Sequence, residues 1–575
     1  MSYSGVPTLK SLAQICRDSG QRKGQGIHFT FLKQGEKSED NLSFEELDCK
    51  ASHLAQMLSG MSLKGKKVLL LFEPGLDFIT TFMGCLYAQV IPIPIYPPNP
   101  MRLERTLPRF QYICQDSGPA CILTTERILG SLDFIFNFAP NLRNYEWIAA
   151  DKDYDAPINW EIPQSSIDSL AFIQYTSGTQ AEPKGVPITN QELMTCLEQL
   201  KLKRQGDEQN CILSWLPFYH DLGLVGAILF PVFLSCRSIL MSPISFIRNP
   251  MTWLKAIHYF KADTTAAPNF ALDLCLRKLE HDKLAELDLS TLKMCLVGSD
   301  VLQAETLSRF CETMAPCGLK KEAIFPGYGQ AETVLSVASG SIHRPYKKIS
   351  FQREFLQKGQ ARPASNDDDG IILVSCGFPM DHLTLEIVDP LTKNICSNGQ
   401  VGEIWVSSQH LPNSYLSGSH ECFQASINGQ SKEGYFKTGD SGFIWDGELF
   451  VLGRIAEGIE IDGRSYRPME FESLVESSPV PNRPGCLAAF ASLDSSRPGV
   501  IILAELDKTS QIIEGREHEP LDQFKDHVET LLMKKYPFPC YLYFVPKDAV
   551  EKTSSGKIRR TICQQKFFSQ KIKTL

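Results

Sequence analysis

The 575-residue sequence lacks the features that mark several specialised classes of protein. Its 18 cysteines include no C-x-x-C pair and no cysteine–histidine group at zinc spacing, which argues against a disulfide framework and a structural zinc site. Its net charge of −8 gives no overall basic surface for nucleic acid. The first residues, MSYSGVPTLK, contain no apolar signal-peptide region. We therefore expect free thiols, a reducing cytoplasmic location and no nucleic-acid partner.

Long apolar runs are also scarce. The uncharged stretch Leu222–Cys236 is shorter than the roughly 20 residues that a membrane span requires, and it contains Pro231. The longer stretch Phe78–Met101 carries prolines throughout its second half, which favours a buried helix followed by an extended segment. Internal repeats and low-complexity tracts are missing too. The sequence therefore predicts a protein without a membrane span.

What the sequence does contain is an alternation of helical and strand patterns, which predicts an α/β fold. At this length the chain exceeds a single hydrophobic core. After residue 453 the pattern changes to a compact α+β series. We expect a large N-terminal domain at 1–453, a hinge at 454–458 and a small domain at 459–575. The clearest predicted elements are helices at Phe44–Ser59, Leu76–Tyr87 and Asn190–Leu202 (with Asn190 as cap) and strands at Lys67–Phe72, Val90–Tyr96 and Ala120–Thr125.

A glycine- and hydroxyl-rich loop follows the apolar strand pattern Leu170–Ile173. It contains Thr176, Ser177, Gly178 and Thr179 and continues to Lys184. Backbone N–H groups, hydroxyls and a lysine are suited to holding phosphate. The loop is not a Walker A motif, because no Gly-Lys-Ser/Thr sequence closes it. A run of this composition can equally be an ordinary turn.

Four further segments carry groups that could share one site. His220 and Asp221 follow an aromatic strand end, and Asp221 could alternatively cap a helix. The run from Phe325 includes Gly327, Tyr328, Gly329, Gln330, Ala331 and Glu332, while Gly298, Ser299 and Asp300 end another strand. A Gly-Tyr-Gly sequence could lie against a planar ring, and a glutamate is a suitable Mg²⁺ ligand. Asp440 could accept ribose hydroxyls, as acidic residues do in dinucleotide sites, with Arg454 close to the same sugar.

The last of these segments is the basic C-terminal stretch. Lys557 follows a Ser-Ser-Gly sequence, which suits charge stabilisation at a phosphate that is being displaced. Residues 552–575 contain seven lysines and arginines and no acidic residue. The outer lysines could simply be solvated, or Lys566 and Lys571 could contact an acidic partner.

Taken in order, these segments resemble the adenylate-forming superfamily, and within it the chain is most similar to the fatty acyl-AMP ligases. The likeness rests on Thr176–Thr179 with Pro183-Lys184-Gly185, Tyr328–Glu332, Thr438-Gly439-Asp440, Gly453-Arg454 and Ser555-Gly556-Lys557. It implies a large N-terminal domain of several subdomains and a small mobile C-terminal domain. It also implies ATP and Mg²⁺ as cofactors, a fatty acid as substrate and an acyl carrier protein as partner.

The resemblance assigns roles to individual residues. The triphosphate would be held by Thr176, Ser177, Gly178, Thr179 and Lys184, adenine by Gly298 to Asp300 and Gly327 to Ala331, and ribose by Asp440 and Arg454. Mg²⁺ would be held by Glu332 and Thr179. Lys557 would bridge the carboxylate and the α-phosphate, and His220 would lie at the mouth of the acyl tunnel.

Residues 341–372 fall where these ligases have an insertion, which in the family hinders a rotation of the small domain that coenzyme A requires. The chain departs from the family pattern at Gln180 and Ala181 in the phosphate loop, at Ala456 in the hinge, and at Glu460 and Asp462 after it. The alternatives are an acyl-CoA synthetase, an amino-acid adenylation domain and a pseudoenzyme that binds nucleotide or lipid.

Overall fold

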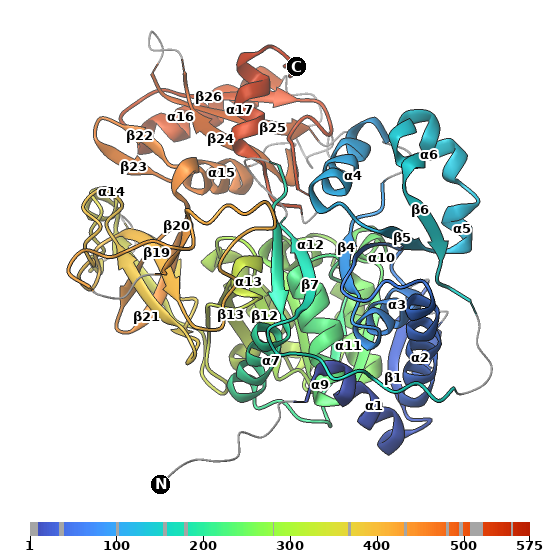
Figure 1. Ribbon diagram of the computed structural model, residues 1–575. Helices are drawn as coiled ribbons and strands as arrows, with labels where there is room; N and C mark the ends of the chain where they lie inside the picture. Colours follow the sequence, from blue (N-terminus) through green and yellow to red (C-terminus); the bar gives the residue numbers. More distant parts are fainter. Residues whose placement is uncertain are drawn as a thin grey trace.

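The computed structural model describes residues 10–33, 39–98, 103–152, 158–176, 182–279, 281–365, 370–430, 434–478, 482–493, 498–506, 521–553 and 556–575. Figure 1 shows residues from about 460 onward as a lobe that stands apart from the larger body of the molecule. The larger body contains two α/β sheets and an antiparallel sheet.

The first α/β unit is a fully parallel sheet with the order β4-β3-β5-β6. Val68 and Leu70 of β3 face the core shared with α1 to α3, whereas Leu69 and Leu71 face the core shared with α4. Burial of both faces explains the uninterrupted apolar sequence of this strand. The elements are α1 (Leu12–Lys23), α2 (Phe44–Gly60), β3 (Lys67–Leu71), α3 (Leu76–Tyr87), β4 (Ile91–Ile95), α4 (Leu103–Ser117), β5 (Cys121–Thr124), α5 (Glu126–Leu129), α6 (Leu132–Phe138) and β6 (Glu146–Ala149). The predicted elements of this unit are confirmed to within one residue.

The second α/β unit is the largest sheet, in the order β17-β14-β13-β12-β11-β9-β10-β1-β2, whose strands from β13 to β1 are parallel. Its strands are β1 (Ile27–Leu32), β2 (Glu39–Ser43), β9 (Cys211–Ser214), β10 (Arg237–Met241), β11 (Thr264–Pro268), β12 (Met294–Gly298), β13 (Ile324–Tyr328), β14 (Ala338–Ser339) and β17 (Phe378–Pro379). The helices along this part of the chain are α7 (Asn190–Arg204), α8 (Asp221–Leu224), α9 (Phe230–Leu234), α10 (Pro243–Arg248), α11 (Met251–Phe260), α12 (Asn269–Arg277) and α13 (Ala304–Met314). Ligands of such sheets bind outside the carboxyl ends of the parallel strands.

A two-stranded antiparallel pair, β7 (Leu170–Tyr175) and β8 (Gly185–Thr189), carries the predicted phosphate loop between its strands. The helix after β8 begins at Asn190 as predicted, but the predicted cap is wrong. Thr189 is the cap, because its side chain accepts the N–H of Glu192 while the Glu192 carboxylate accepts the N–H of Thr189.

The antiparallel sheet has the order β18-β19-β20-β21, from strands β18 (Thr384–Val388), β19 (Gly402–Ser407), β20 (Phe436–Trp445) and β21 (Glu448–Arg454). The predicted insertion forms a hairpin of β15 (Lys348–Gln352) and β16 (Gly370–Val374) with α14 (Arg353–Gln357). The fully buried Phe351 packs against Phe443 and Phe450 of β20 and β21. The segment is therefore anchored to the antiparallel sheet by its own apolar residues.

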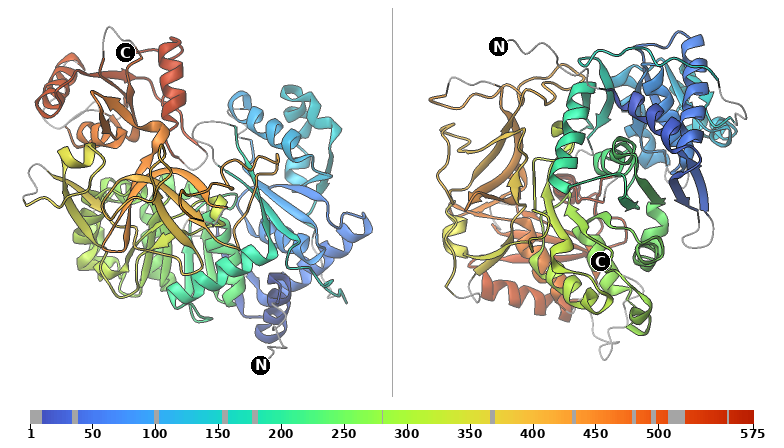
Figure 2. Two further views of the ribbon diagram at one scale, coloured as in Figure 1. Left: turned by 60° about the vertical axis from the view of Figure 1, so that its left-hand side comes forward. Right: turned by 90° about the horizontal axis from the view of Figure 1, so that it is seen from below.

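The C-terminal lobe has a separate core around Phe471 and Leu542. Its elements are β22 (Ile459–Ile461), β23 (Arg464–Tyr466), α15 (Pro468–Ser477), β24 (Asn482–Ala491), β25 (Val500–Leu506), α16 (Leu521–Lys535), β26 (Cys540–Val545) and α17 (Arg560–Phe568). Strands β24 and β25 are antiparallel, and β25 and β26 are parallel. Figure 2 shows this lobe meeting the larger body along one side. Within the described residues, no helix is both long and apolar enough to cross a membrane.

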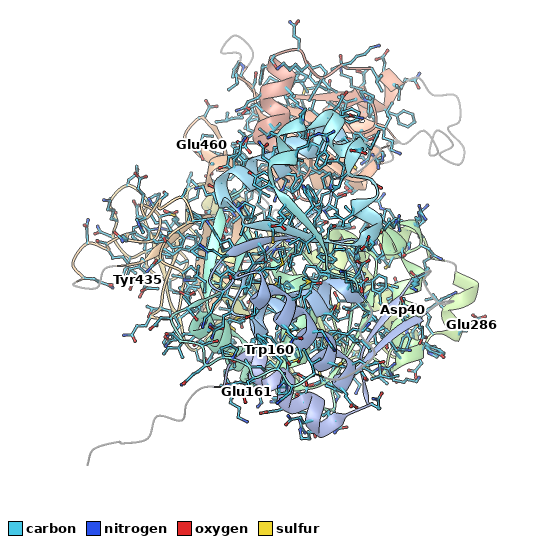
Figure 3. All side chains as sticks on the ribbon, turned by 45° about the vertical axis from the view of Figure 1, so that its right-hand side comes forward. Asp40, Trp160, Glu161, Glu286, Tyr435 and Glu460 are labelled. Atoms are coloured by element: carbon cyan, nitrogen blue, oxygen red, sulfur yellow. The ribbon has the colours of Figure 1, made fainter. Side chains whose placement is uncertain are left out.

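The departures at Glu460 and Asp462 have a simple structural reason. Both side chains are exposed on the hairpin of β22 and β23, where Glu460 is labelled in Figure 3. Asp462 and Gly463 have φ values of 50° and 69°, as the two central residues of a type I′ turn require. Asp462 is therefore a turn residue.

Candidate functional site

A cleft of about 460 Å³ is lined by residues at the carboxyl ends of the central parallel strands and by residues of the C-terminal lobe. It collects residues that are up to 386 positions apart, from Gln174 to Arg560. The predicted site residues that line it are Thr176, Lys184, His220, Ser299, Asp300, Gly327, Tyr328, Gly329, Gln330, Ala331, Glu332, Asp440, Arg454 and Lys557. Gly298 is the buried last residue of β12, and Ser177, Gly178 and Thr179 lie outside the described residues, as do Gln180 and Ala181.

The two ends of the phosphate loop are fastened to each other. The N–H of Thr176 donates to the carbonyl of Lys184 at 2.9 Å, and the N–H of Lys184 donates to the Thr176 hydroxyl at 3.1 Å. Arg109 of α4 donates to the Thr176 carbonyl at 3.0 Å. The loop between Thr176 and Lys184 therefore begins and ends at fixed points beside the cleft.

His220 and Asp221 lie just after β9, where the strand delivers them to the cleft. His220 Nδ1 is 3.6 Å from Asp221 Oδ1, and His220 is the residue before α8. Burial acts to raise the pKa of Asp221, but the contact with His220 and the charge of Lys557 lower it below its ordinary value. Asp221 thus stays ionised between two basic side chains, one of them from the C-terminal lobe.

The glycines at the strand ends are required by close backbone packing. A Cβ on Gly298 would come within 2.7 Å of the Gly327 carbonyl oxygen, and a Cβ on Gly329 within 1.8 Å of the Leu335 carbonyl oxygen. The sequence interpretation gave Gly329 the task of admitting a ligand ring. Packing against the chain at Leu335 already excludes any side chain there.

The backbone after Glu332 contains a strained turn that the sequence did not reveal. Val334 has φ 64° and ψ −51°, and the N–H of Leu335 donates to the carbonyl of Thr333 at 2.7 Å. These values describe a classic γ-turn, which is rare and costly for a β-branched residue. The turn brings the chain back against Gly329, so it fixes the segment that carries Glu332.

Asp440 and Arg454 face each other across the paired strands β20 and β21. Arg454 Nε is 3.1 Å from Asp440 Oδ1, and the Tyr328 hydroxyl donates to Asp440 Oδ2 at 2.6 Å. Arg454 also donates to the Thr438 carbonyl at 2.7 Å. Each carboxylate oxygen of Asp440 can still accept a second hydrogen bond, as recognition of a vicinal diol requires. The Tyr328 ring is fixed at the same place.

Glu332 has the surroundings of a single-carboxylate cation site. Burial raises its pKa above the ordinary value, although the hydrogen bond from Tyr415 and the charge of Arg454 oppose that shift. A carboxylate whose charged form is disfavoured by burial is stabilised by a bound cation. Mg²⁺ is commonly bound by one or two carboxylates together with substrate phosphates. In the described part of the chain, no group of three or more histidine, cysteine, aspartate or glutamate residues could hold a metal.

Lys557 enters the cleft from a short loop of the C-terminal lobe. Its N–H donates to the Thr553 hydroxyl at 3.1 Å and its carbonyl accepts the N–H of Thr553 at 2.8 Å. Gly556 has φ 88°, which favours glycine at this turn. These contacts fix the backbone that carries Lys557 at the cleft.

Sequence reasoning missed three cleft residues that make strong contacts. Tyr415 donates to Glu332, while Arg560 pairs with Glu457 at 2.7 Å beside the cleft. Tyr415 lies in a polar loop without a pattern of its own. Arg560 was visible only as one member of the basic stretch. Their partners are far away in sequence, so no local signal identifies them.

Comparison with known proteins gives one consistent family. The chain matches the model of the AMP-binding enzyme family over residues 17–416. It is 32% identical over 570 residues to the medium-chain-fatty-acid–[acyl-carrier-protein] ligase JamA of Moorena producens, covering 98% of this chain and 95% of that protein. It is 30% identical to the long-chain-fatty-acid–AMP ligase FadD26 of Mycobacterium bovis, covering 99% of each.

Solved structures lead to the same group. The crystal structure of a fatty acid AMP ligase from Legionella pneumophila has a TM-score of 0.74 and 30% identity, covering 99% of this chain and 97% of that one. A structure from a study of fatty acyl-adenylate ligases of E. coli and L. pneumophila has a TM-score of 0.85 at 25% identity, covering 98% and 99%.

Proposed function

The chain belongs to the AMP-binding enzyme family and, within it, to the fatty acyl-AMP ligases. From this premise we propose that it uses ATP to convert a medium- or long-chain fatty acid into its acyl-adenylate. Pyrophosphate is the second product. The observation that carries the proposal is the meeting of Lys557 from the C-terminal lobe with His220, Glu332 and Asp440 from the larger body in one cleft. An acid, a triphosphate and a sugar can then be held at the same time.

The nucleotide is held by side chains that are already positioned. Asp440 accepts the ribose hydroxyls while Arg454 and Tyr328 keep its carboxylate oriented. The adenine ring lies against Tyr328, beside the strand ends that include Ser299. Lys184 meets the triphosphate at the end of its loop. The proposed roles of Ser177, Gly178 and Thr179 in that loop follow from the family resemblance.

The reaction joins the fatty carboxylate to the α-phosphorus. One carboxylate oxygen attacks the phosphorus, the bond to the bridging oxygen of pyrophosphate breaks, and no proton needs to move. The chain's main task is to align two anions and to neutralise their charge. Lys557 contacts both anions, and His220, held beside the ionised Asp221, lies at the carboxylate. Mg²⁺ held by Glu332 supplies further neutralisation of the phosphate oxygens when it is bound.

We further propose that the acyl group passes to the phosphopantetheine arm of an acyl carrier protein. The relative JamA is named as a ligase of medium-chain fatty acid and acyl carrier protein. The support from this chain is the insertion, because Arg353 of α14 donates to Glu470 of α15 at 2.7 Å and so ties the two parts together. Of the two lysines considered for carrier docking, Lys566 is engaged with Glu551, whereas Lys571 is exposed. Carrier contact through this face would therefore use Lys571. The free cysteines support a cytoplasmic location.

Exchange of radiolabelled pyrophosphate into ATP, dependent on fatty acid, tests the first step. We expect exchange with the wild type and a loss of about 10²-fold or more in Lys557→Ala, as for removal of a preorganised charge-stabilising group. Lys571→Ala is the matched control, since it removes an exposed lysine from the same lobe. Fatty-acid-independent binding of ATP without exchange would contradict the proposal and favour a nucleotide-binding pseudoenzyme.

A paired assay tests the second step. A panel of C8–C18 fatty acids is incubated with ATP and Mg²⁺, together with either coenzyme A or a holo acyl carrier protein, and the products are identified by mass spectrometry. Thioester on the carrier alone is the expected result. Efficient formation of acyl-CoA would instead make this chain an acyl-CoA synthetase.

A further inference from the structure

Tyr415 lies between two residues that the proposed function places on opposite sides of the phosphates. It belongs to the loop between β19 and β20, and it lines the cleft although its side chain is largely buried. Its hydroxyl donates to Glu332 Oε1 at 2.9 Å. The ammonium group of Lys184 lies 4.5 Å from the centroid of its ring. One side chain therefore contacts both a carboxylate and a cation of the site by different parts of its surface.

The ring is held in place without help from its hydroxyl. Tyr415 packs edge-on against Phe423, with ring centroids 5.0 Å apart. The N–H of Gly418 donates to the Tyr415 carbonyl at 2.9 Å, which closes a turn. The N–H of Leu416 donates to the carbonyl of Gly185 at 2.7 Å, so the loop is docked directly after Lys184. Removing the hydroxyl alone should leave the ring where it is.

The hydroxyl is placed to donate to the carboxylate. A phenol has one O–H, and its oxygen lies 2.9 Å from Glu332 Oε1, which as a carboxylate oxygen accepts. A hydrogen bond to one carboxylate oxygen fixes the orientation of the other, which is the usual task of residues that support a metal-binding carboxylate.

We propose that Tyr415 is a positioning residue that aligns Glu332 for Mg²⁺ through its hydroxyl and Lys184 for the triphosphate through its ring. The proposal rests on the proposed function for the identity of the two ligands. The two contacts are separable, because the hydroxyl contacts Glu332, with the Cys422 thiol beside it, whereas the ring face contacts Lys184. A cation at about this distance from an aromatic face is attracted by the ring, more strongly when water is excluded.

The test uses two substitutions at the same position. Tyr415→Phe removes the hydroxyl and keeps the ring, whereas Tyr415→Leu removes both. Tyr435→Phe is the matched control, since Tyr435 is also buried and donates to a side chain, Gln430. Tyr435, labelled in Figure 3, belongs to a separate buried cluster with Val388, Trp405 and Ile427 and does not line the cleft.

The readout is ATP binding by titration calorimetry with and without Mg²⁺, which does not depend on turnover. In Tyr415→Phe, the factor by which Mg²⁺ tightens ATP should fall about tenfold, with metal-free ATP affinity unchanged. In Tyr415→Leu, the metal-free affinity should fall as well. In steady-state assays, Tyr415→Phe should raise the Mg²⁺ concentration for half-maximal rate and leave KM for fatty acid unchanged.

Two results would overturn the proposal. One is an unchanged Mg²⁺ effect on ATP binding in Tyr415→Phe, equal to that of the wild type and Tyr435→Phe. The other is equal metal-free ATP affinity in the two Tyr415 variants. Failure of the proposed function would appear differently, as wild-type protein that binds ATP with Mg²⁺ but forms no acyl-adenylate.

Discussion

Replacing Arg353 by alanine should let the protein make acyl-CoA. Arg353 belongs to the insertion, and its guanidinium donates to Glu470 of the C-terminal lobe at 2.7 Å. The side chain of Glu470 is only 7% exposed and that of Arg353 is 21% exposed, so solvent screens the pair little. The family resemblance assigns thioester formation with coenzyme A to a rotated position of that lobe, and this ion pair has to break for the rotation.

The size of the effect follows from the type of contact. A hydrogen bond between charged groups contributes about 1.5–3 kcal/mol. Since about 1.4 kcal/mol corresponds to a factor of ten, its loss should shift the balance toward the rotated position by about tenfold to 100-fold. Glu470 keeps a partner after the substitution, because the N–H of Arg467 still donates to its Oε1 at 3.1 Å. The variant should therefore fold normally.

The assay compares acyl-CoA formation with acyl-adenylate formation by mass spectrometry. Arg353→Ala should raise the first at least about tenfold and leave the second unchanged. Arg362→Ala is the control, because Arg362 is in the same insertion but stacks on Phe355 within it, 3.9 Å from the ring centroid. In a double-mutant cycle, adding Glu470→Gln to Arg353→Ala should have no further effect. Equal acyl-CoA rates in the Arg353 and Arg362 variants would refute the reasoning.

Three further predictions concern nucleotide binding and stability. Asp440→Asn removes the charge that holds the side chains of Tyr328 and Arg454. It should raise KM for ATP by at least about tenfold, since truncating one partner of a buried charge pair costs about 2–5 kcal/mol. An unchanged KM for ATP would show that Asp440 does not bind the ribose. Gly329→Ala should prevent folding or lower the melting temperature strongly, because the new Cβ would lie 1.8 Å from a carbonyl oxygen. Gly60→Ala is the control: its Cβ would have no atom within 4 Å, so it should change stability by at most about 1 kcal/mol. Similar melting temperatures for the two variants would contradict this prediction. His28 is fully buried, and burial lowers its pKa to about 3. As the pH falls, the unfolded chain therefore protonates this histidine before the folded chain does, and the free energy of unfolding should fall by up to about 4 kcal/mol between about pH 6.5 and 3. In urea titrations over this range, the wild type should lose more stability than His28→Gln.

The sequence was informative wherever local periodicity and burial act together. Strand β3 and helix α3 could be predicted because each is buried on more than one side, which leaves continuous apolar residues. The hairpin of β15 and β16 could not, because in β15 only Phe351 is buried and polar residues stand on both sides of it. Strand β16 is a short apolar run that directly follows a polar and acidic segment, and the sequence alone did not separate the two.

In the candidate site, too, the sequence predicted the individual residues but not how they are arranged in space. Individual motifs marked Tyr328, Asp440 and Lys557 because each combines a turn with a chemically suited side chain. Their relative placement depends on the order of the parallel strands and on the packing of the C-terminal lobe, which no local pattern encodes. Tyr415 was missed for that reason, since its whole role comes from two partners that are at least 83 positions away.

Arg560 shows how the site and the predicted hinge at 454–458 are joined mechanically. Its guanidinium contacts Glu457 at 2.7 Å and both carboxylate oxygens of Glu472, at 2.8 and 2.7 Å. Glu472 also accepts the N–H of Ala489 in β24 at 2.9 Å. Removing one partner from a buried ionic group of this kind costs about 3–5 kcal/mol, so Glu457 should move with the C-terminal lobe. A rotation of the lobe that keeps this group intact must then turn about residues before Glu457, close to Gly453, whose φ of 122° is accessible chiefly to glycine.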